Sequence, residues 1–488
     1  MTEVQTQQRH YICIDLKSFY ASVECVERGL DPMTACLVVA DPDRSKNTIC
    51  LAVTPAMKRL GVRNRCRLGD IPPTLEYIIA KPRMQRYIDY AARIYGIYLS
   101  YISKDDIHVY SIDEAFMDVT EYLELYQATP RELGRRIMDT ILDRTGIRAT
   151  CGIGTNLYLT KIALDITAKH SPDFIGELDE ASYRATLWNH RPLTDFWRVG
   201  RGTADRLATY GIHTMGDIAH TDEDFLYRLF GIDAELLIDH AWGREPVTIA
   251  DIHNYHSRSK CLSSGQVLMS DYPFDKGRLI VKEMMDVLCL DMLKKDVVTS
   301  SVSLFIGYSG SDYYGFSQSA RSAGAIGQRS DAALISAGQP HGEHASSSPG
   351  GSRRTDFRAS MQPRGEHASS PADHPSQYAR GTTTLASPSN LSADWLPAIA
   401  SLYDRIVDPA LTIRRVNITC NNIVHEEFHQ FDLFADSAVS DKQKRLQSAI
   451  SEVQSRFGRD AMLRGMNLEE GAMTRERNHQ IGGHSSGE

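Results

Sequence analysis

Acidic residues interrupt otherwise apolar strands at two places in the first 120 residues of the chain. The segment from Tyr11 to Asp15 is apolar until its last residue, and the segment 107–120 predicts two strands with Asp113 and Glu114 between them. Neighbouring residues in a regular strand point to opposite faces, so adjacent acids reach one site only where a turn or bulge interrupts the strand. The fold must therefore contain a sheet whose strands end or bend at these acids.

Strands alternate with helix-length segments over residues 1–176, which predicts an α/β or α+β domain. A helical pattern with glycine turns at 199–202 and at Gly211 predicts a small all-helical domain over 187–243, and a third domain is expected from about residue 256. The expected strands are 11–15, 37–40, 48–53, the pair within 107–120, 147–154, 261–268, 297–308 and 413–420. The expected helices are 19–29, 55–60, 84–102, 131–145, 157–169, 276–294, 393–405 and 441–457.

The third domain is interrupted by a segment of unusual composition. Residues 318–373 are rich in Ser, Gly, Ala, Pro, His and Arg, and they contain a near-duplicate, Q-P-H-G-E-H-A-S-S at 339–347 and Q-P-R-G-E-H-A-S-S at 362–370. Such a segment buries too little apolar surface to offset its ordering entropy, which predicts a disordered insertion. A frayed tail is expected at 478–488.

Composition excludes several classes of protein. No run approaches the roughly 18 apolar residues of a membrane helix, and the polar start is unlike a signal peptide, so we expect a cytoplasmic protein that makes no membrane contact. The nine cysteines form no C-x-x-C pair, which argues against zinc ribbons, dithiol redox motifs and secreted disulfide frameworks. The net charge of −8 argues mildly against nucleic-acid binding, although residues 41–86 hold ten Lys or Arg and only four acids.

The same acids also indicate a site for divalent cations. Three hard oxygen donors that converge would suit Mg²⁺, and two such ions can activate an attacking oxygen and stabilise a leaving one. From spacing alone, the same acids could instead cap strand ends or lie in a solvated turn. The run G-I-G-T-N at 152–156 lacks the third glycine of a dinucleotide fingerprint, because Leu157 stands there, and no P-loop motif occurs.

Three blocks in order resemble the signatures of Y-family DNA polymerases, most closely the UmuC-like bacterial branch. They are D-L-K-S-F-Y-A-S-V-E at 15–24, Y-S-I-D-E-A-F-M-D-V at 110–119 and G-I-G-T-N-L-Y-L-T-K-I-A at 152–163. The resemblance covers residues 1–250 strongly and 256–436 more loosely. It implies an α+β multidomain right-hand polymerase with a ferredoxin-like palm, small fingers, a helix-hairpin-helix thumb and an α+β little finger.

Domain boundaries and site residues follow from the same resemblance. It implies a palm at 1–18 and 85–176, fingers at 19–84, a thumb at 177–250, a little finger at 256–436 with the insertion, and a C-terminal helix with a flexible tail at 437–488. The residues that match the family's metal site, which holds two Mg²⁺, are Asp15, Asp113, Glu114 and the backbone carbonyl of Leu16.

The resemblance also implies nucleotide contacts. Tyr20 matches the steric gate that selects dNTP over rNTP, and Phe19 would support it. Lys58 and Lys169 match positions that bind the triphosphate, although each alone could be an ordinary surface lysine. Pro55 stands where the family often has Tyr, so one expected phosphate contact is missing.

Two further segments would bind DNA or a partner. Gly200, Arg201 and Gly202 form a G-x-G turn before a helix, which exposes backbone N–H groups to a DNA phosphate but could also be a simple tight turn. Gln430, Leu433 and Phe434 are similar to the peptide that binds the bacterial sliding clamp, and otherwise they would form an ordinary strand end.

The function that the resemblance implies is translesion DNA synthesis. The primer 3′-hydroxyl would attack the α-phosphate of a dNTP on primer–template DNA, with the sliding clamp and possible accessory damage-response proteins as partners. The family also implies regulation by DNA damage, as in the SOS response. Two alternatives stay open: a non-catalytic DNA-binding subunit of the damage response, and a palm-domain nucleotidyl cyclase.

Overall fold

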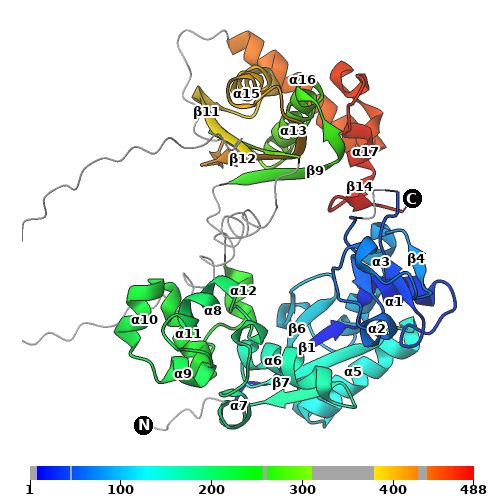
Figure 1. The fold of residues 1–488 in the computed structure, drawn as a ribbon, viewed down its shortest axis with the longest axis vertical. Coiled ribbons are helices and arrows are strands. Elements are labelled where there is room, and N and C mark those ends of the chain that lie inside the picture. Colours follow the sequence, from blue (N-terminus) through cyan, green and yellow to red (C-terminus); the bar gives the residue numbers. More distant parts are fainter. Residues whose placement is uncertain (1–7, 44–46, 256–260, 310–377, 427–436, 488) are drawn as a thin grey trace, which may run out of the picture. The chain divides into compact units, whose positions relative to one another are not determined.

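The computed structural model describes residues 8–43, 47–255, 261–309, 378–426 and 437–487 (Figure 1). They form two compact units, one made of residues before 260 together with those from 453 onward, the other made of residues between 260 and 452. The predicted insertion at 318–373 and the predicted clamp residues Gln430, Leu433 and Phe434 lie outside the described residues. Among the helices that are described, none is long and apolar enough to cross a membrane.

A mixed five-stranded sheet carries the N-terminal acids, in the order β5-β6-β1-β7-β8. The central strand β1 runs antiparallel to β6 and β7, and β8 pairs with β7 in parallel. This sheet, with the helices around it, confirms the expected α+β class, although the sequence analysis missed β8. The strands are β1 (Tyr11–Leu16), β5 (Ile107–Val109), β6 (Glu114–Asp118), β7 (Ala149–Gly154) and β8 (Ile175–Leu178).

Alternate residues of β1 face opposite sides of this sheet. Ile12 and Ile14 are buried in the core that includes helices α3 and α5, whereas Cys13 is buried on the other side, in a cluster with residues of helix α6. Because side chains alternate along a strand, Asp15 lies on the same side as Cys13. The helices are α3 (Met84–Leu99), α5 (Pro130–Thr145) and α6 (Leu157–Ile162).

The glycines of the G-I-G-T-N run allow α6 to lie directly on β7. A Cβ at Gly152 would lie 2.3 Å from the Thr160 carbonyl oxygen, and one at Gly154 would lie 2.4 Å from the Thr160 nitrogen. Real Cβ atoms do not approach backbone so closely, so these positions require glycine. The run therefore has a packing role.

The expectation of one helix over 157–169 is wrong. Helix α6 ends at Ile162, and a π-helical turn (Ala163–Thr167) and a 3₁₀ turn (Ala168–His170) follow. Both turns lie against β8, since a Cβ at Gly176 would meet the Ala163 carbonyl oxygen at 2.4 Å. The segment 163–170 thus departs from α-helical geometry where it packs on β8.

A smaller sheet forms the segment expected to be the fingers. Its order is β3-β2-β4, with β2 antiparallel to β3 and parallel to β4. The core is small and includes Val38, Val53 and Met57. The elements are α1 (Phe19–Val26), β2 (Leu37–Val39), β3 (Ala52–Val53), α2 (Pro55–Arg59) and β4 (Ile78–Ala80).

Helices follow β8, as the sequence predicts. Side chains of Asp179, Thr214, Asp222 and Thr248 cap four of them at their N-termini. The helices are α7 (Glu180–Leu187), α8 (Arg201–Ala208), α9 (Met215–Ala219), α10 (Glu223–Phe230), α11 (Asp233–Trp242) and α12 (Ile249–Asn254).

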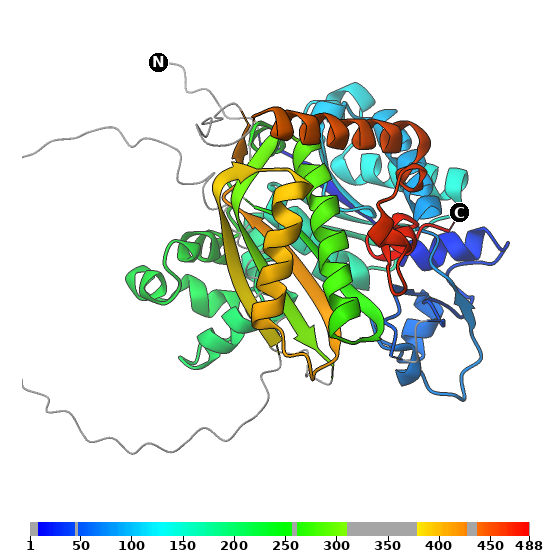
Figure 2. The same cartoon turned by 90° about the horizontal axis from the view of Figure 1, so that it is seen from above.

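The second unit is an antiparallel sheet, β11-β10-β12-β9, with two long helices side by side across one face (Figure 2). Trp395, Ile399 and Met284 are buried on this side. The sequence analysis missed β11, which is rich in Thr, Ser and Ala. The elements are β9 (Leu262–Tyr272), α13 (Phe274–Lys294), β10 (Val297–Tyr308), β11 (Tyr378–Ser389), α15 (Ser392–Ile406), β12 (Ile413–Asn421), β13 (Val424–His425) and α16 (Ser437–Phe457).

The tail that we expected to be frayed is folded onto the first unit. Helix α17 (Thr474–Asn478) leads into a hairpin of β14 (Gln480–Ile481) and β15 (His484–Ser485). The backbone N–H of Gln85, in α3, donates to the Ser486 carbonyl at 2.9 Å, and Ile481 packs against the main core. These contacts explain why the polar tail is ordered.

Candidate active site

The register of β1 and β6 brings the three acids together. Asp15 pairs with Glu114 across the two strands, and the Leu16 N–H donates to the Asp113 carbonyl at 2.9 Å. The N–H groups of Tyr110 and Ser111 both donate to the Glu114 carbonyl at 3.0 Å, which closes a tight turn before β6. This turn is the interruption that adjacent acids require.

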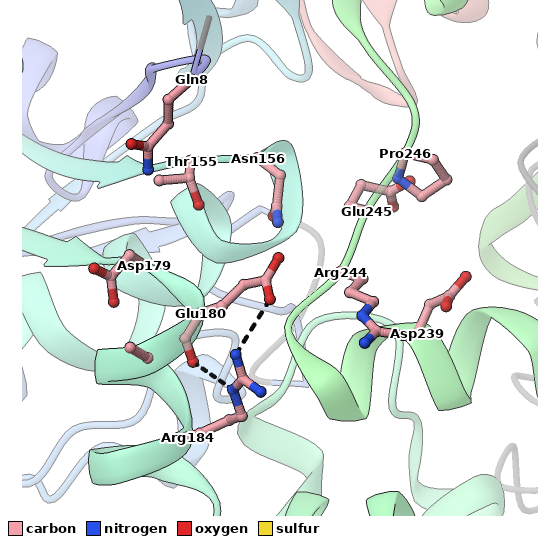
Figure 3. A pocket seen from close by; sticks show the side chains of 11 residues that line it. Gln8, Thr155, Asn156, Asp179, Glu180, Arg184, Asp239, Arg244, Glu245 and Pro246 are labelled. Atoms are coloured by element: carbon pink, nitrogen blue, oxygen red, sulfur yellow. Dashed lines mark hydrogen bonds and ion pairs between the residues drawn. The ribbon is translucent and has the colours of Figure 1, made fainter. Parts of the chain in front are cut away.

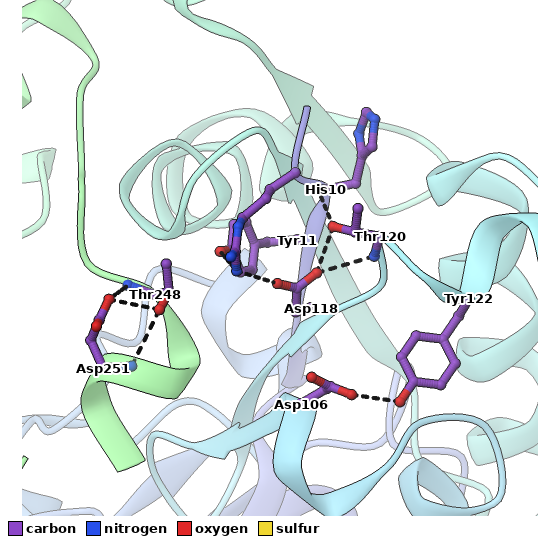
Figure 4. Close-up of polar contacts among 9 residues, drawn as sticks. His10, Tyr11, Asp106, Asp118, Thr120, Tyr122, Thr248 and Asp251 are labelled. Atoms are coloured by element: carbon purple, nitrogen blue, oxygen red, sulfur yellow. Dashed lines mark hydrogen bonds and ion pairs between the residues drawn. The ribbon is translucent and has the colours of Figure 1, made fainter. Parts of the chain in front are cut away.

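Polar contacts at the opposite end of β1 fix that register (Figure 4). The His10 N–H donates to the Thr120 hydroxyl at 2.9 Å, and this hydroxyl donates to the Asp118 carboxylate at 2.6 Å. Because a slip of one residue would turn every side chain to the other face, these bonds help to hold Asp15 opposite Glu114.

Asp113 has a partner of its own within the turn. The Ser111 hydroxyl donates to Asp113 Oδ1 at 2.6 Å. This hydrogen bond restricts the rotation of the Asp113 side chain. The S-I-D-E run therefore supplies both the acid and the group that orients it.

Glu114 is a buried carboxylate paired with a buried lysine. Lys161 Nζ lies 2.7 Å from Glu114 Oε1 and 2.8 Å from Oε2, and 3.1 Å from Asp165 Oδ2. The Cys13 thiol also donates to Glu114, at 3.3 Å. Burial alone would lower the pKa of Lys161, but Glu114 and Asp165 raise it above its ordinary value. Lys161 is therefore a permanent cation at this site.

The electrostatics of Asp15 indicate a cation site. Burial, and then the negative charges of Asp113 and Glu114, raise the pKa of Asp15 to about 7. A divalent cation between these carboxylates would relieve that repulsion, and carboxylate oxygens are the ligands that Mg²⁺ prefers. Within the described residues, no three His, Cys, Asp or Glu side chains are grouped to hold a metal by themselves. Since Mg²⁺ is usually held by one or two carboxylates and substrate phosphates, the residues fit this ion.

Three lysines surround the same region. The positive charges of Lys58 and Lys169 act on Lys17, and the Asp15 carboxylate interacts with both Lys17 and Lys58. Burial, and then neighbouring lysines, lower the pKa of Lys17; burial also lowers that of Lys58. Lysines that repel one another next to an acid form a site for a polyanion. The structure thus brings Lys58 and Lys169 into one region together with Lys17, which was not predicted from the sequence, and binding of a triphosphate there stays a prediction.

Tyr20 lies on α1, close to these groups. Its ring stacks on that of Tyr87 with centroids 4.5 Å apart, and Phe19 lies at 5.8 Å in a tilted arrangement. Lys58 Nζ donates to the hydroxyl of Ser18, the residue before α1, at 2.8 Å. The segment before and within α1 is therefore in contact with both α2 and α3.

The predicted DNA-binding turn precedes helix α8. Gly200 is the N-cap residue, and no side chain caps this helix. Arg201 and Gly202 are exposed at its first turn. The N-terminal N–H groups are thus available to an anion, and a role in DNA binding stays a prediction.

The open cavity drawn in Figure 3 is a separate feature. It has a volume of about 650 Å³ and is lined by residues of α7 and α11 and of the adjoining loops, among them Asn156, Arg184 and Arg244. Arg184 pairs with Glu180 at 3.3 Å within it. None of the predicted site residues lines this cavity, so it is not the candidate active site.

Comparisons with known proteins find similar chains and a similar solved structure. Residues 14–165 match the impB/mucB/samB family. Two relatives from Bacillus subtilis (strain 168) are a putative UV-damage repair protein UvrX, 25% identical over 99% of both chains, and a DNA polymerase IV 2, 28% identical over 96% of this chain and 97% of the relative. A solved Y-family DNA polymerase chimera matches with a TM-score of 0.56 at 18% identity, over 85% of this chain and 99% of that one.

The comparisons support the predicted resemblance to Y-family DNA polymerases. The family match over residues 14–165 includes all three blocks on which the resemblance was based, so the predicted resemblance is confirmed. The expected fold class is confirmed as well. The roles of individual residues are not tested by these comparisons and remain predictions.

Proposed function

We propose that this Y-family chain is a template-directed DNA polymerase that copies past damaged DNA. The observation that carries the proposal is the convergence of Asp15, Asp113 and Glu114 at the end of paired strands β1 and β6. The family match and the relatives named DNA polymerase IV support the same reaction. The primer 3′-hydroxyl attacks the α-phosphate of a dNTP, and pyrophosphate leaves.

Asp15, Asp113 and the Leu16 carbonyl would hold Mg²⁺, with Glu114 as a further ligand. When bound, two such ions lower the pKa of the primer hydroxyl and neutralise charge on the leaving phosphates. Lys161 has a different role in this chain, since it balances the charge of Glu114 from within the protein. Asp15 and Asp113 are therefore the acids on which the reaction depends most.

The triphosphate would lie among Lys17, Lys58 and Lys169. Three cations next to the metal site neutralise a tetra-anionic substrate and fix its orientation, and positioning and charge stabilisation supply most of the catalysis in phosphoryl transfer. Tyr20 would lie against the deoxyribose and exclude a 2′-hydroxyl. No side chain at Pro55 replaces the hydroxyl that the family often has there.

The domain assignment is also a proposal. We assign the five-stranded sheet to the palm, the β3-β2-β4 sheet to the fingers, helices α7 to α12 to the thumb and the second unit to the little finger. Gly200, Arg201 and Gly202 would contact a DNA phosphate. The sliding clamp would bind Gln430, Leu433 and Phe434, which lie outside the described residues, and accessory proteins remain possible.

Primer extension tests the proposal. The full-length protein with Mg²⁺ and all four dNTPs is expected to extend a primer on an undamaged template and to insert a nucleotide opposite an abasic position. Leaving out the template should abolish synthesis. Product formation without primer–template would favour a nucleotidyl cyclase, and DNA binding without extension, with or without loaded clamp, would favour a non-catalytic subunit.

The proposed clamp segment needs a separate assay. Deleting 430–434 is expected to leave extension without clamp unchanged and to abolish the stimulation by loaded clamp, because tethering raises the effective concentration of the primer end. Full stimulation of the deleted protein would contradict the assignment of this segment.

A further inference from the structure

Helices α1 and α3 contact each other through two matched pairs of residues. Tyr20 and Glu24 are one turn apart on α1, and Arg83 and Tyr87 are one turn apart at the start of α3. The Tyr20 and Tyr87 rings stack at 4.5 Å with an angle of 17° between their planes. The Tyr87 hydroxyl also donates to Glu24 Oε1 at 2.8 Å. One side chain, Tyr87, therefore contacts both α1 residues.

Glu24 is a fully buried carboxylate whose partners are all cations or hydrogen-bond donors. Arg83 Nε and Nη2 each donate to it at 2.9 Å, and Arg28 pairs with it as well. Burial would raise the pKa of Glu24, but the bonds from Arg83, Arg28 and Tyr87 lower it below its ordinary value. Glu24 is thus a fixed anion, and the Tyr87 hydroxyl has a fixed acceptor.

Both the ring and the hydroxyl of Tyr87 are fixed by contacts in the protein interior. It is 0% exposed, its hydroxyl is bonded to Glu24, and its ring belongs to the main core. Tyr20, in contrast, is only partly buried and rests on Tyr87 through one ring face. The direction of the Tyr20 ring therefore depends on the ring beneath it.

We propose that Tyr87, held by Glu24 and Arg83, is a positioning residue that keeps the Tyr20 ring in place and thereby sets discrimination against ribonucleotides. This inference rests on the proposed function. A ring that excludes one hydroxyl group must be held closely in place, since a change of rotamer would open the space that the hydroxyl needs. Tyr87 is fully buried and stacks on Tyr20, so it acts through Tyr20.

The same helix pair provides a matched control. The Tyr90 hydroxyl donates to Glu27 Oε1 at 2.8 Å, and Tyr90 is also buried in the main core. Tyr90 thus repeats the tyrosine–glutamate bond of Tyr87 three residues further along α3, and among the described residues no ring contact joins it to Tyr20. Loss of Tyr90 weakens the contact between α1 and α3 but leaves the stack of Tyr87 on the Tyr20 ring in place.

The experiment measures insertion of one dNTP and of the matching rNTP by the full-length protein, with Mg²⁺ and primer–template. The variants are Tyr20→Ala, Tyr87→Leu, Tyr87→Phe and Tyr90→Leu. We expect Tyr87→Leu to raise kcat/KM for the rNTP relative to the dNTP about tenfold, the size of effect that loss of an aromatic stack supports. Tyr87→Phe keeps the ring and should stay within about threefold of wild type, as should Tyr90→Leu.

The outcomes separate the inference from the proposed function. If wild type inserts dNTPs and Tyr20→Ala gains rNTP insertion, the gate is established. The inference then requires that Tyr87→Leu also gains rNTP insertion and that Tyr90→Leu does not. Equal ratios of rNTP to dNTP insertion for Tyr87→Leu and Tyr90→Leu would overturn the inference but would leave the proposed polymerase function standing. No insertion by wild type would overturn both.

Poor folding of Tyr87→Leu would not remove the test. Glu24→Gln keeps the size of the side chain but removes the charge that anchors Arg83, and we expect it to raise relative rNTP insertion severalfold. An unchanged discrimination ratio for Glu24→Gln, with dNTP insertion intact, would also contradict the inference.

Discussion

The ion pair between Lys161 and Glu114 allows a quantitative test of the active-site geometry. Both side chains are 8% exposed, and Lys161 Nζ lies within 2.8 Å of both Glu114 oxygens. The variant Lys161→Met has nearly the same size and leaves Glu114 buried, with the Cys13 thiol as its remaining side-chain partner among the described residues. Breaking a buried pair on one side typically costs about 3–5 kcal/mol, so we expect the free energy of unfolding to fall by this amount.

Lys169→Met is the matched control. Lys169 pairs with the same Asp165, at 3.0 Å, but its side chain is 50% exposed. Exposed pairs contribute about 0–1 kcal/mol, so this variant should unfold almost like wild type. Urea unfolding followed by circular dichroism gives both free energies.

A double-mutant cycle isolates the pair itself. Combining Lys161→Met with Glu114→Gln removes both charges, and we expect a coupling energy of about 2 kcal/mol or more. The reasoning would be refuted if Lys161→Met lost less than about 1 kcal/mol, as Lys169→Met should, or if the coupling were near zero. Either result would mean that Glu114 is solvated.

Three further predictions concern the fold. Gly152→Ala should abolish folding of the domain that contains the five-stranded sheet, because its Cβ would meet backbone, whereas Gly96→Ala, which has open space, should fold normally in circular dichroism. Truncation after Asn478 should lower the free energy of unfolding by about 2 kcal/mol, through loss of the hairpin contacts with α3, as measured in urea. Burial lowers the pKa of His240, so below about pH 6.5 the unfolded state binds a proton that the folded state does not, and stability should fall between pH 7 and pH 5. His240→Phe should flatten that slope.

Much of the domain built on the five-stranded sheet could be predicted from the sequence. The acids stand at the ends of apolar strands, and adjacent acids require a turn, which the contacts of Tyr110 and Ser111 with Glu114 provide. Helices with a clear helical spacing of apolar residues, such as α3 and α5, were also predicted with bounds close to those in the structure. These features depend on residues near one another in the chain.

What the sequence could not predict depends on tertiary packing. Lys161 pairs with Glu114 because α6 lies on β7, and a lysine in a helix pattern gives no sign of that contact. Lys17 joins Lys58 and Lys169 only once β1, α2 and the turn after α6 are placed. A local signal existed for Lys17, since it follows Asp15 by two residues.

Several elements were not predicted from the sequence, and three of them were missed for different reasons. β8 is only four residues long, and β11 is a run of Thr, Ser and Ala whose strand conformation is fixed by pairing with β10. The C-terminal hairpin is polar, and it is ordered by contact with α3, far away in the sequence. Tyr87 likewise looks like one aromatic among several on α3 until its ring is found against Tyr20.

The measurement that tests the central claim most directly is primer extension by Asp113→Ala, with wild type and Asp139→Ala alongside. Asp139 is an exposed acid on α5, so its loss should leave the rate unchanged. If the carboxylates at the end of β1 and β6 carry nucleotidyl transfer, Asp113→Ala should lose at least about 100-fold in single-turnover rate while it still binds primer–template. Extension by Asp113→Ala at the wild-type rate would contradict the account.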